Sequence, residues 1–216
     1  MKKIVLIGDS IRLGYEKYIK DAFDGVCSVL SSDENGKFAV NVLRFAHEWK
    51  NTGNWGDDVD VVHWNAGLWD VLHIFSDKQT MTPIDCYADY VKRIDKHLRM
   101  LFPKAKMIFA TSTAVLEKNY DQRFFRYNRE IEQYNAVAIE ALKDTDTQID
   151  DLYAITITAP ESCYSDKVTH FATEEGVELV GGKVLDVLCE AVGIDRKTLT
   201  VHNGTPVKID DKTLGF

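Results

Sequence analysis

The chain has 216 residues, of which 45% are hydrophobic, and it carries a formal net charge of −8. This length is enough for one domain with a continuous core, and the negative charge argues against a nucleic-acid surface, which needs clustered Lys and Arg. No apolar run is long enough to span a bilayer, and the run that follows Lys3 is too short for a signal peptide. We therefore expect a cytoplasmic protein that binds neither nucleic acid nor membrane.

Short β-branched runs alternate with longer helical patterns, which is typical of βαβ units and a mostly parallel sheet. Five of these runs each contain a continuous apolar stretch, as strands covered on both faces should. In chain order, the predicted strands are residues 3–8, 26–31, 59–65, 106–111 and 151–155.

Apolar residues at spacings of three and four predict the intervening helices. One helix begins at Pro83 and ends before Pro103, a second begins near Asn128, and a third begins at Thr173 and stops at Gly193. Shorter helices are predicted directly after Ser10 and over residues 38–49. These elements predict a three-layer α/β/α sandwich over residues 1–193, followed by residues 194–216 as an appended hairpin or tail.

The segment Gly8-Asp9-Ser10 follows the first strand, and ligands of open α/β sheets gather at the carboxyl ends of strands. Gly8 permits a tight turn, after which Ser10 begins a helix whose free N–H groups favour negative charge. Ser10 is therefore either a nucleophile or the cap of that helix, and the tripeptide alone does not distinguish the two roles. A nucleotide-binding protein of the flavodoxin type is disfavoured, because the glycine spacing of a phosphate loop is missing.

A serine nucleophile needs a base, and His170 is the best placed of the six histidines. It follows the fifth predicted strand, and Asp166, four residues upstream, is placed to orient the imidazole. His73 lies beyond the third strand and is a candidate for substrate contact. The other histidines have more ordinary positions in predicted elements, and packing or surface roles are expected for His47, His63 and His97.

The four cysteines lack CxxC spacing, so neither a metal site nor a redox pair is predicted, and no cofactor is expected. Cys163 precedes His170 closely enough to be a weaker candidate for the nucleophile.

The Gly8-Asp9-Ser10 segment and the Asp166/His170 pair resemble the first and fifth sequence blocks of SGNH (GDSL-type) serine hydrolases. The resemblance extends from residue 3 to about residue 192. It implies a flavodoxin-like fold with a five-stranded parallel sheet of order 2-1-3-4-5. It also implies an oxyanion hole formed by the Ser10 N–H, the N–H of a glycine after strand two, which is Gly36 here, and an asparagine after strand three.

Two positions depart from the family pattern. Trp69 stands where the family has the asparagine, so Asn65 either supplies an amide from a neighbouring position or only ties down the loop. Lys167 stands where the family has the aspartate, three residues before His170. Either the loop bulges so that Asp166 reaches His170, which we favour, or the enzyme works as a Ser-His dyad.

These residues predict a serine esterase that forms an acyl-enzyme on Ser10. No long apolar loop indicates a lipase entrance, so a short acyl group, acetyl, is expected, and the resemblance implies a saccharide or other small-molecule ester. The aromatic and basic residues 120–129 either border a sugar-sized cleft or fill the core. The alternative is a catalytically inactive SGNH-like domain that binds a carbohydrate or a protein partner.

Overall fold

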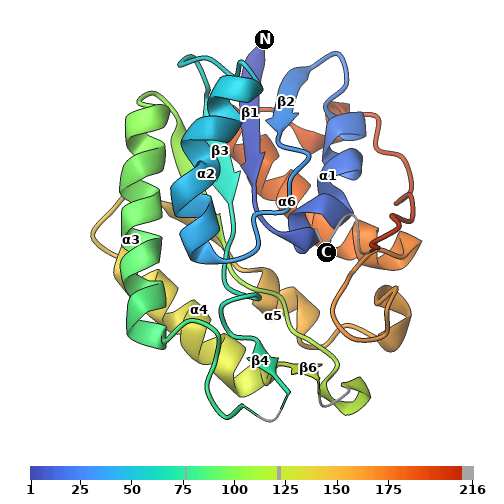
Figure 1. Cartoon of the computed structure of the whole chain (residues 1–216). Coiled ribbons are helices and arrows are strands. Elements are labelled where there is room, and N and C mark those ends of the chain that lie inside the picture. The colour runs from blue at the N-terminus through green and yellow to red at the C-terminus, as the bar shows by residue number, and fades with distance from the viewer. Residues whose placement is uncertain (76, 121–122, 211–216) are drawn as a thin grey trace.

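The computed structural model describes residues 1–75, 77–120 and 123–210. A five-stranded parallel sheet forms its centre (Figure 1). The strands lie in the order β2-β1-β3-β5-β7, which confirms the predicted fold class and strand order. Their bounds are Lys2–Ile7 for β1, Cys27–Ser31 for β2, Val61–Trp64 for β3, Lys106–Ala110 for β5 and Gln148–Asp150 for β7.

The fifth strand lies earlier in the chain than the sequence predicts. Residues 148–150 pair with β5, whereas most of the predicted segment 151–155 belongs to the short helix α5 (Leu152–Thr156). Asp151 caps this helix by accepting a hydrogen bond from the Ala154 N–H at 3.1 Å. The cap satisfies a free N–H of the first helical turn, and a local interaction of this kind favours helix over strand.

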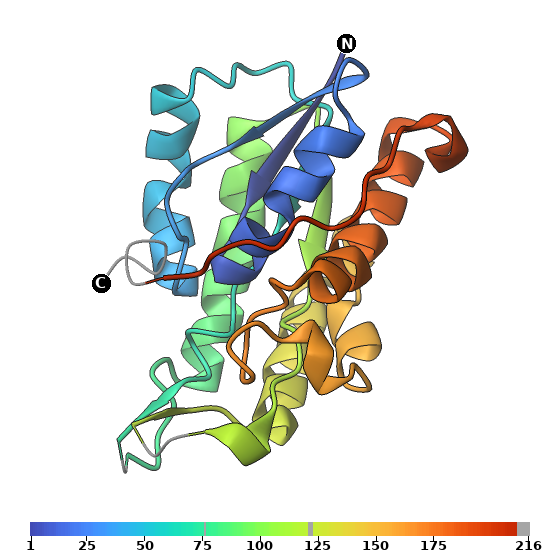
Figure 2. The same ribbon diagram turned by 90° about the vertical axis from the view of Figure 1, so that its right-hand side faces the viewer.

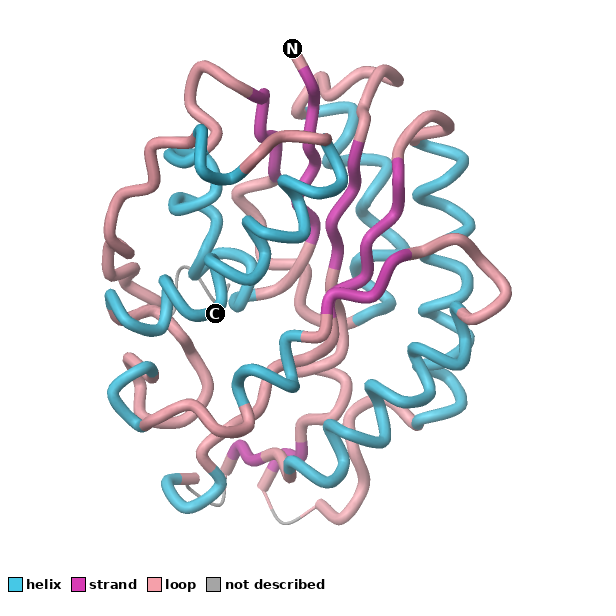
Figure 3. The backbone as a smooth tube through the Cα atoms, turned by 180° about the vertical axis from the view of Figure 1, so that it is seen from behind, coloured by secondary structure: helices cyan, strands magenta, loops and turns pink. Residues whose placement is uncertain are grey.

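Two groups of helices enclose the sheet (Figures 2 and 3). The helices α1 (Ser10–Ala22) and α6 (Glu174–Val192) pack against each other on one face. On the other face, α3 (Ile84–Leu101) packs between α2 (Ala39–Thr52) and α4 (Asn128–Leu142). Gly193 ends α6 in a left-handed conformation with φ 74°, as predicted for its role as a stop. None of the described helices is long and apolar enough to cross a membrane.

A small antiparallel ribbon lies beyond the carboxyl ends of the central strands (Figure 1). It pairs β4 (His73–Ile74) with β6 (Phe124–Phe125). Three 3-10 turns complete the elements of the described chain: η1 (Glu117–Asn119), η2 (Glu161–Cys163) and η3 (Arg196–Thr198). The ribbon brings the segment after β3 and the segment after β5 to the same edge of the sheet.

The chain after α6 is a tail without strands through residue 210, so the described part of residues 194–216 forms no hairpin (Figure 2). It is anchored to the start of α6, where the Gly204 N–H donates to Glu178 Oε1 at 3.0 Å. The Val207 N–H donates to the Ala172 carbonyl oxygen, also at 3.0 Å. The tail therefore packs beside the segment that carries His170.

Candidate active site

Ser10, His170 and Asp166 form a connected chain of hydrogen bonds at the carboxyl end of the sheet. Ser10 Oγ lies 2.9 Å from His170 Nε2, and His170 Nδ1 lies 2.7 Å from Asp166 Oδ2. When the proton is on Nδ1, the ring donates to Asp166 and accepts from the Ser10 hydroxyl. Ser10 is buried, and it is the first residue of α1, so its backbone N–H has no acceptor within the helix.

The loop before His170 is shaped so that Asp166 reaches the ring across a spacing of four residues. Lys167 adopts a left-handed conformation with φ 59°, which turns the chain between the two residues. Asp166 Oδ1 then accepts from the N–H groups of Val168, Thr169 and His170 at 2.8 to 3.0 Å, leaving Oδ2 for the imidazole. Partial burial alone would raise the pKa of Asp166, but the His170 side chain and these N–H groups hold it below its usual value.

Asp9 caps α1 from a buried position beneath the site. Its Oδ1 accepts from the Ile11 N–H at 3.0 Å. Burial raises the pKa of Asp9, while the Asn65 side chain, the Ile11 N–H and the positive charge of Arg126 act in the opposite direction. Asn65 is buried beside Asp9, and its side chain acts to lower the pKa of that carboxyl.

Glycine is required at position 8 for a reason other than the tight turn predicted from the sequence. Gly8 does not have a left-handed backbone. Instead, a Cβ atom at this position would lie 1.8 Å from Asn65 Oδ1. This distance is too short for two atoms that are not bonded to each other. Glycine is required here because the Asn65 carboxamide lies directly against the backbone.

Replacing Gly8 by alanine is therefore expected to destabilise the protein by about 1 to 3 kcal/mol, because Asn65 and its neighbours must move. Urea denaturation measures the effect. Gly14→Ala is the matched control, since a Cβ there would come no closer than 3.8 Å to its nearest neighbour, Phe171 O. Because alanine favours helix, that variant should gain about 0.5 to 1 kcal/mol. Equal stability of Gly8→Ala and the wild type would contradict the steric argument.

Gly36, the predicted second oxyanion donor, lies close to the nucleophile segment but is engaged there. Its N–H donates to the Gly8 carbonyl oxygen at 2.9 Å. A Cβ on Gly36 would lie 2.8 Å from the same oxygen, so the two segments are in close contact. This hydrogen bond fixes the loop after β2 against the loop after β1.

Asp70 is a fully buried carboxyl that holds the loop after β3. It accepts from the Thr82 hydroxyl at 2.8 Å and from the Ala39 N–H at 2.9 Å, at the start of α2. Burial raises the pKa of Asp70 to about 6. These contacts give Asp70 a structural role, which is to join the loop after β3 to the start of α2.

The raised pKa of Asp70 predicts that stability falls as pH rises. Between the ordinary aspartate value of about 4 and the folded value, the folded state binds more protons than the unfolded state. Stability should therefore decrease by on the order of 3 kcal/mol from pH 4 to pH 7 through this group. Asp70→Asn removes this dependence, which urea denaturation at both pH values will measure, while Asn at the exposed Asp89 should leave the pH dependence unchanged. The same pH dependence in Asp70→Asn and the wild type would contradict the assignment.

A cavity of about 280 Å³ adjoins Ser10 and His170. Trp69 lies in its wall and packs edge-on against Phe38, with ring centroids 5.6 Å apart. Arg126 also lines the cavity, and its Nε–H donates to the Leu68 carbonyl oxygen. The remaining walls are mostly apolar and come from the loop after β3, from β4 and from β6. They include Leu68, Leu72, Ile74 and Phe124.

His73, predicted to contact substrate, packs behind this wall and does not line the cavity. It is buried, with Nε2 2.7 Å from Glu130 Oε2. Its ring stacks on Phe125 at a centroid distance of 4.9 Å. The neighbouring Ile74 points a side chain into the cavity instead, as the alternation of side chains along a strand requires.

Cys163, the weaker nucleophile candidate, does not line the cavity either. It is buried in η2, and burial raises the pKa of its thiol. Both properties disfavour a thiolate nucleophile.

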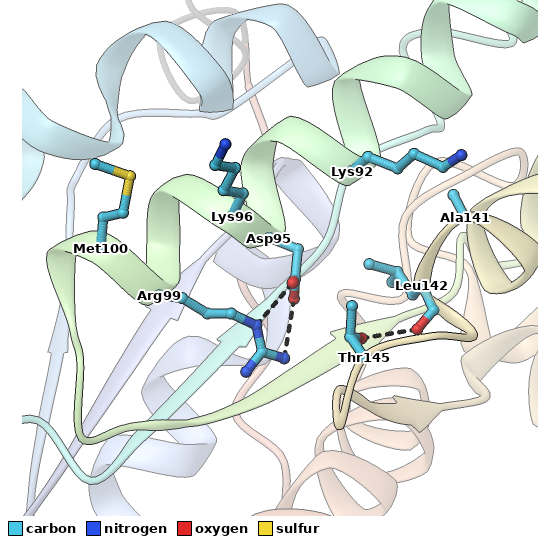
Figure 4. A pocket seen from close by; sticks show the side chains of 8 residues that line it. All are labelled: Lys92, Asp95, Lys96, Arg99, Met100, Ala141, Leu142 and Thr145. Carbon is cyan, nitrogen blue, oxygen red and sulfur yellow. Dashed lines mark hydrogen bonds and ion pairs between the residues drawn. The ribbon is translucent and has the colours of Figure 1, made fainter.

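A second cavity, of about 430 Å³, lies between α3 and the end of α4 (Figure 4). Since α3 leads into β5, this cavity is at the amino end of the strands, away from Ser10. Arg99 turns onto the buried Asp95, with Arg99 Nε 2.8 Å from Asp95 Oδ2. The pair neutralises itself, so the cavity offers no convergent set of reactive groups.

The sequence singles out part of this wall, namely Trp69 and the aromatic and basic stretch that contains Phe124 and Arg126. It does not indicate the remaining wall residues, which are ordinary core formers with no chemical signature: Phe38, Leu68, Leu72 and Ile74. No spacing in the sequence indicates that the segments after β3 and β5 meet through the β4–β6 ribbon.

No protein-family model and no curated protein matches this sequence. Solved structures match most of its length. A lipase/acylhydrolase from Enterococcus faecalis aligns with 94% of this chain and 99% of its own, at a TM-score of 0.69 and 18% identity. The acetylxylan esterase Axe2 from Geobacillus stearothermophilus aligns with 90% of this chain and 95% of its own, at a TM-score of 0.63 and 16% identity. A family 3 carbohydrate esterase from Clostridium thermocellum aligns with 89% and 98%, at a TM-score of 0.62 and 14% identity. The chain has the SGNH-type hydrolase fold.

Proposed function

We propose that the protein is a serine ester hydrolase in which Ser10 is the nucleophile, His170 the general base and Asp166 the residue that orients the imidazole. The observation that carries the proposal is the unbroken chain of contacts, 2.9 Å from Ser10 Oγ to His170 Nε2 and 2.7 Å from His170 Nδ1 to Asp166 Oδ2. A nucleophile, a base and an orienting carboxylate in this arrangement form the machinery of acyl transfer.

In the proposed reaction, Ser10 Oγ attacks the acyl carbonyl carbon while His170 Nε2 takes the hydroxyl proton. The tetrahedral intermediate collapses, the alcohol leaves with that proton, and the acyl group remains on Ser10. Water then attacks the acyl-enzyme, assisted by His170, and releases the carboxylic acid. Asp166 remains ionised throughout and stabilises the imidazolium.

The Ser10 N–H is the oxyanion donor that the geometry supports best. It lies at the start of α1, where free N–H groups and the helix dipole favour negative charge. For the Gly36 N–H to join it, its hydrogen bond to the Gly8 carbonyl would have to break. Asn65 supports Asp9, and Trp69 contributes an aromatic wall in place of an amide.

The substrate expected from the sequence is an acetyl ester of a carbohydrate. Two of the structural neighbours are an acetylxylan esterase and a carbohydrate esterase, and this similarity supports a saccharide ester as the substrate. The apolar walls beside Ser10 support an apolar acyl group more directly. The proposal of an acetylated saccharide as the substrate therefore rests on the similarity of fold to these esterases.

The proposal is tested by covalent labelling. A fluorophosphonate should react with the purified protein, and mass spectrometry of its peptides should locate the adduct on Ser10. Label on another residue would overturn Ser10 as the nucleophile, and no reaction at all would overturn the proposal in favour of the inactive binding domain.

A further inference from the structure

We propose that the cavity beside Ser10 binds the acyl part of the substrate as an uncharged apolar chain of about six to eight carbons. The protein would then be a medium-chain ester hydrolase and not an acetylesterase. This inference rests on the proposed function, because it takes Ser10 as the point from which the acyl chain extends.

The walls of the cavity are mostly apolar. Six apolar side chains line the cavity, and they come from the start of α2, the loop after β3 and the β4–β6 ribbon: Phe38, Leu68, Trp69, Leu72, Ile74 and Phe124. Recognition of a sugar needs several polar groups aimed at its hydroxyls. Among the described residues that line this cavity, the polar side chains besides Ser10 and His170 are Thr169 and Arg126, and Trp69 carries an indole N–H.

The cavity is larger than an acetyl group requires. An apolar cavity of roughly 150 Å³ is enough to hold a six-carbon ring. The cavity beside Ser10 has a volume of about 280 Å³, so an acetyl group would leave most of it unfilled. A chain of six to eight carbons would contact all the walls and remove their apolar surface from water.

The charge beside the cavity comes from Arg126. Arg126 is the one permanently charged side chain among the residues that the structure places around the cavity. Its guanidinium is held by the Leu68 carbonyl oxygen and interacts with the buried carboxyl of Asp9. Since this charge already has partners within the protein, the walls favour an uncharged chain.

Trp69 adds apolar surface to the cavity at a position where the SGNH pattern has a polar residue. In the SGNH pattern an asparagine stands at this position, and here the indole forms part of the apolar wall beside Phe38. The substitution exchanges a polar group near the reacting carbonyl for surface that an acyl chain can contact.

The outer rim of the cavity is also apolar. Phe124 is 46% exposed, and its ring centroid lies 6.3 Å from that of Phe75, which is 60% exposed. Exposed aromatic rings at the rim of an apolar cavity offer further contact to a chain that extends beyond it.

The test varies the acyl chain while the leaving group stays fixed. We expect kcat/KM for p-nitrophenyl esters to rise from acetate through butyrate to hexanoate or octanoate, by up to about fourfold for each added methylene. A total gain of about 30-fold or more supports the inference. A flat series, or a preference for acetate, would overturn it while leaving the ester hydrolase in place.

Two variants probe the wall itself. Ile74→Trp reduces the cavity volume and should lower the octanoate-to-acetate ratio about tenfold. Ile139→Trp is the matched control, because Ile139 is 40% exposed on α4 and does not line the cavity. Its ratio should equal that of the wild type. If Ile74→Trp fails to fold, Phe124→Ala at the exposed rim should still lower the ratio severalfold, and an unchanged ratio there contradicts the inference.

Two further measurements separate the possible failures. If the protein hydrolyses no ester of any length, the proposed function fails, and calorimetric titration of Ser10→Ala with octanoate and acetate tests the cavity alone. Binding of octanoate only supports an apolar site, whereas equal affinity or no binding overturns it. A higher kcat/KM for an ester whose acyl chain ends in a carboxylate than for the octanoate ester would also contradict an uncharged acyl chain. It would indicate that Arg126 recognises the carboxylate.

Discussion

Ser10→Ala is expected to lower kcat/KM for p-nitrophenyl butyrate by at least about 10⁴-fold, with the fold unchanged. The hydroxyl oxygen is the atom to which the acyl group bonds, and Cys163, the other nucleophile candidate, is buried and does not line the cavity. His170→Ala should cause a loss of similar size. The double variant should be little worse than either single one, since a nucleophile without its base and a base without its nucleophile are equally inactive.

Ser162→Ala is the control for this experiment. Ser162 is exposed in η2, in the same segment of chain as His170, and its side chain is remote from the cavity walls. Its activity should equal that of the wild type. Retention of more than a few per cent of activity in Ser10→Ala, with circular dichroism showing a folded protein, would exclude the acyl-enzyme.

Asp166→Asn is expected to lower kcat by about 10³- to 10⁴-fold. An asparagine oxygen at the Oδ1 position can still accept the three backbone N–H groups that shape the loop. Its amide NH₂ then faces His170 Nδ1 and forces the other tautomer, in which Nε2 carries the proton. Nε2 can no longer accept the proton of Ser10, so the base is lost although the loop remains.

The stability of this variant provides a second, independent measurement. Because the pKa of Asp166 is lower in the folded protein than in the unfolded chain, its ionised form stabilises the fold at neutral pH. That contribution is lost as pH falls through the lowered pKa. Asp166→Asn should therefore be less stable than the wild type at pH 7, and the difference should shrink on acidification.

Lys167→Gly controls for changes in the loop. Lys167 has a left-handed conformation that glycine adopts without strain, so this variant should keep its activity and gain up to about 1 kcal/mol in stability. An Asp166→Asn enzyme as active as Lys167→Gly would show that His170 needs no orienting carboxylate, which is the dyad interpretation.

Much of the architecture could be predicted because it depends on local patterns. The last four residues of β1, β3 and β5 are buried and, apart from His63, apolar, so their sequence alone identifies these strands. The predicted position of the fifth strand is wrong because residues 152–155 are also apolar, and the cap that Asp151 provides directs this segment into a helix. A short apolar run does not distinguish strand from helix.

The sequence by itself determined the parallel sheet and the pairing of Ser10 with a histidine near the other end of the chain. These follow from apolar periodicity and from the rule that functional groups gather at the carboxyl ends of parallel strands. The strand order was implied by the resemblance to SGNH hydrolases. Only the tertiary structure decided that Asp166 reaches His170, that the Gly36 N–H is engaged by Gly8, and that His73 packs behind the cavity wall. It also decided that the space beside Ser10 is apolar, because its walls come from segments far apart in the chain, and such contacts leave no pattern in any one of them.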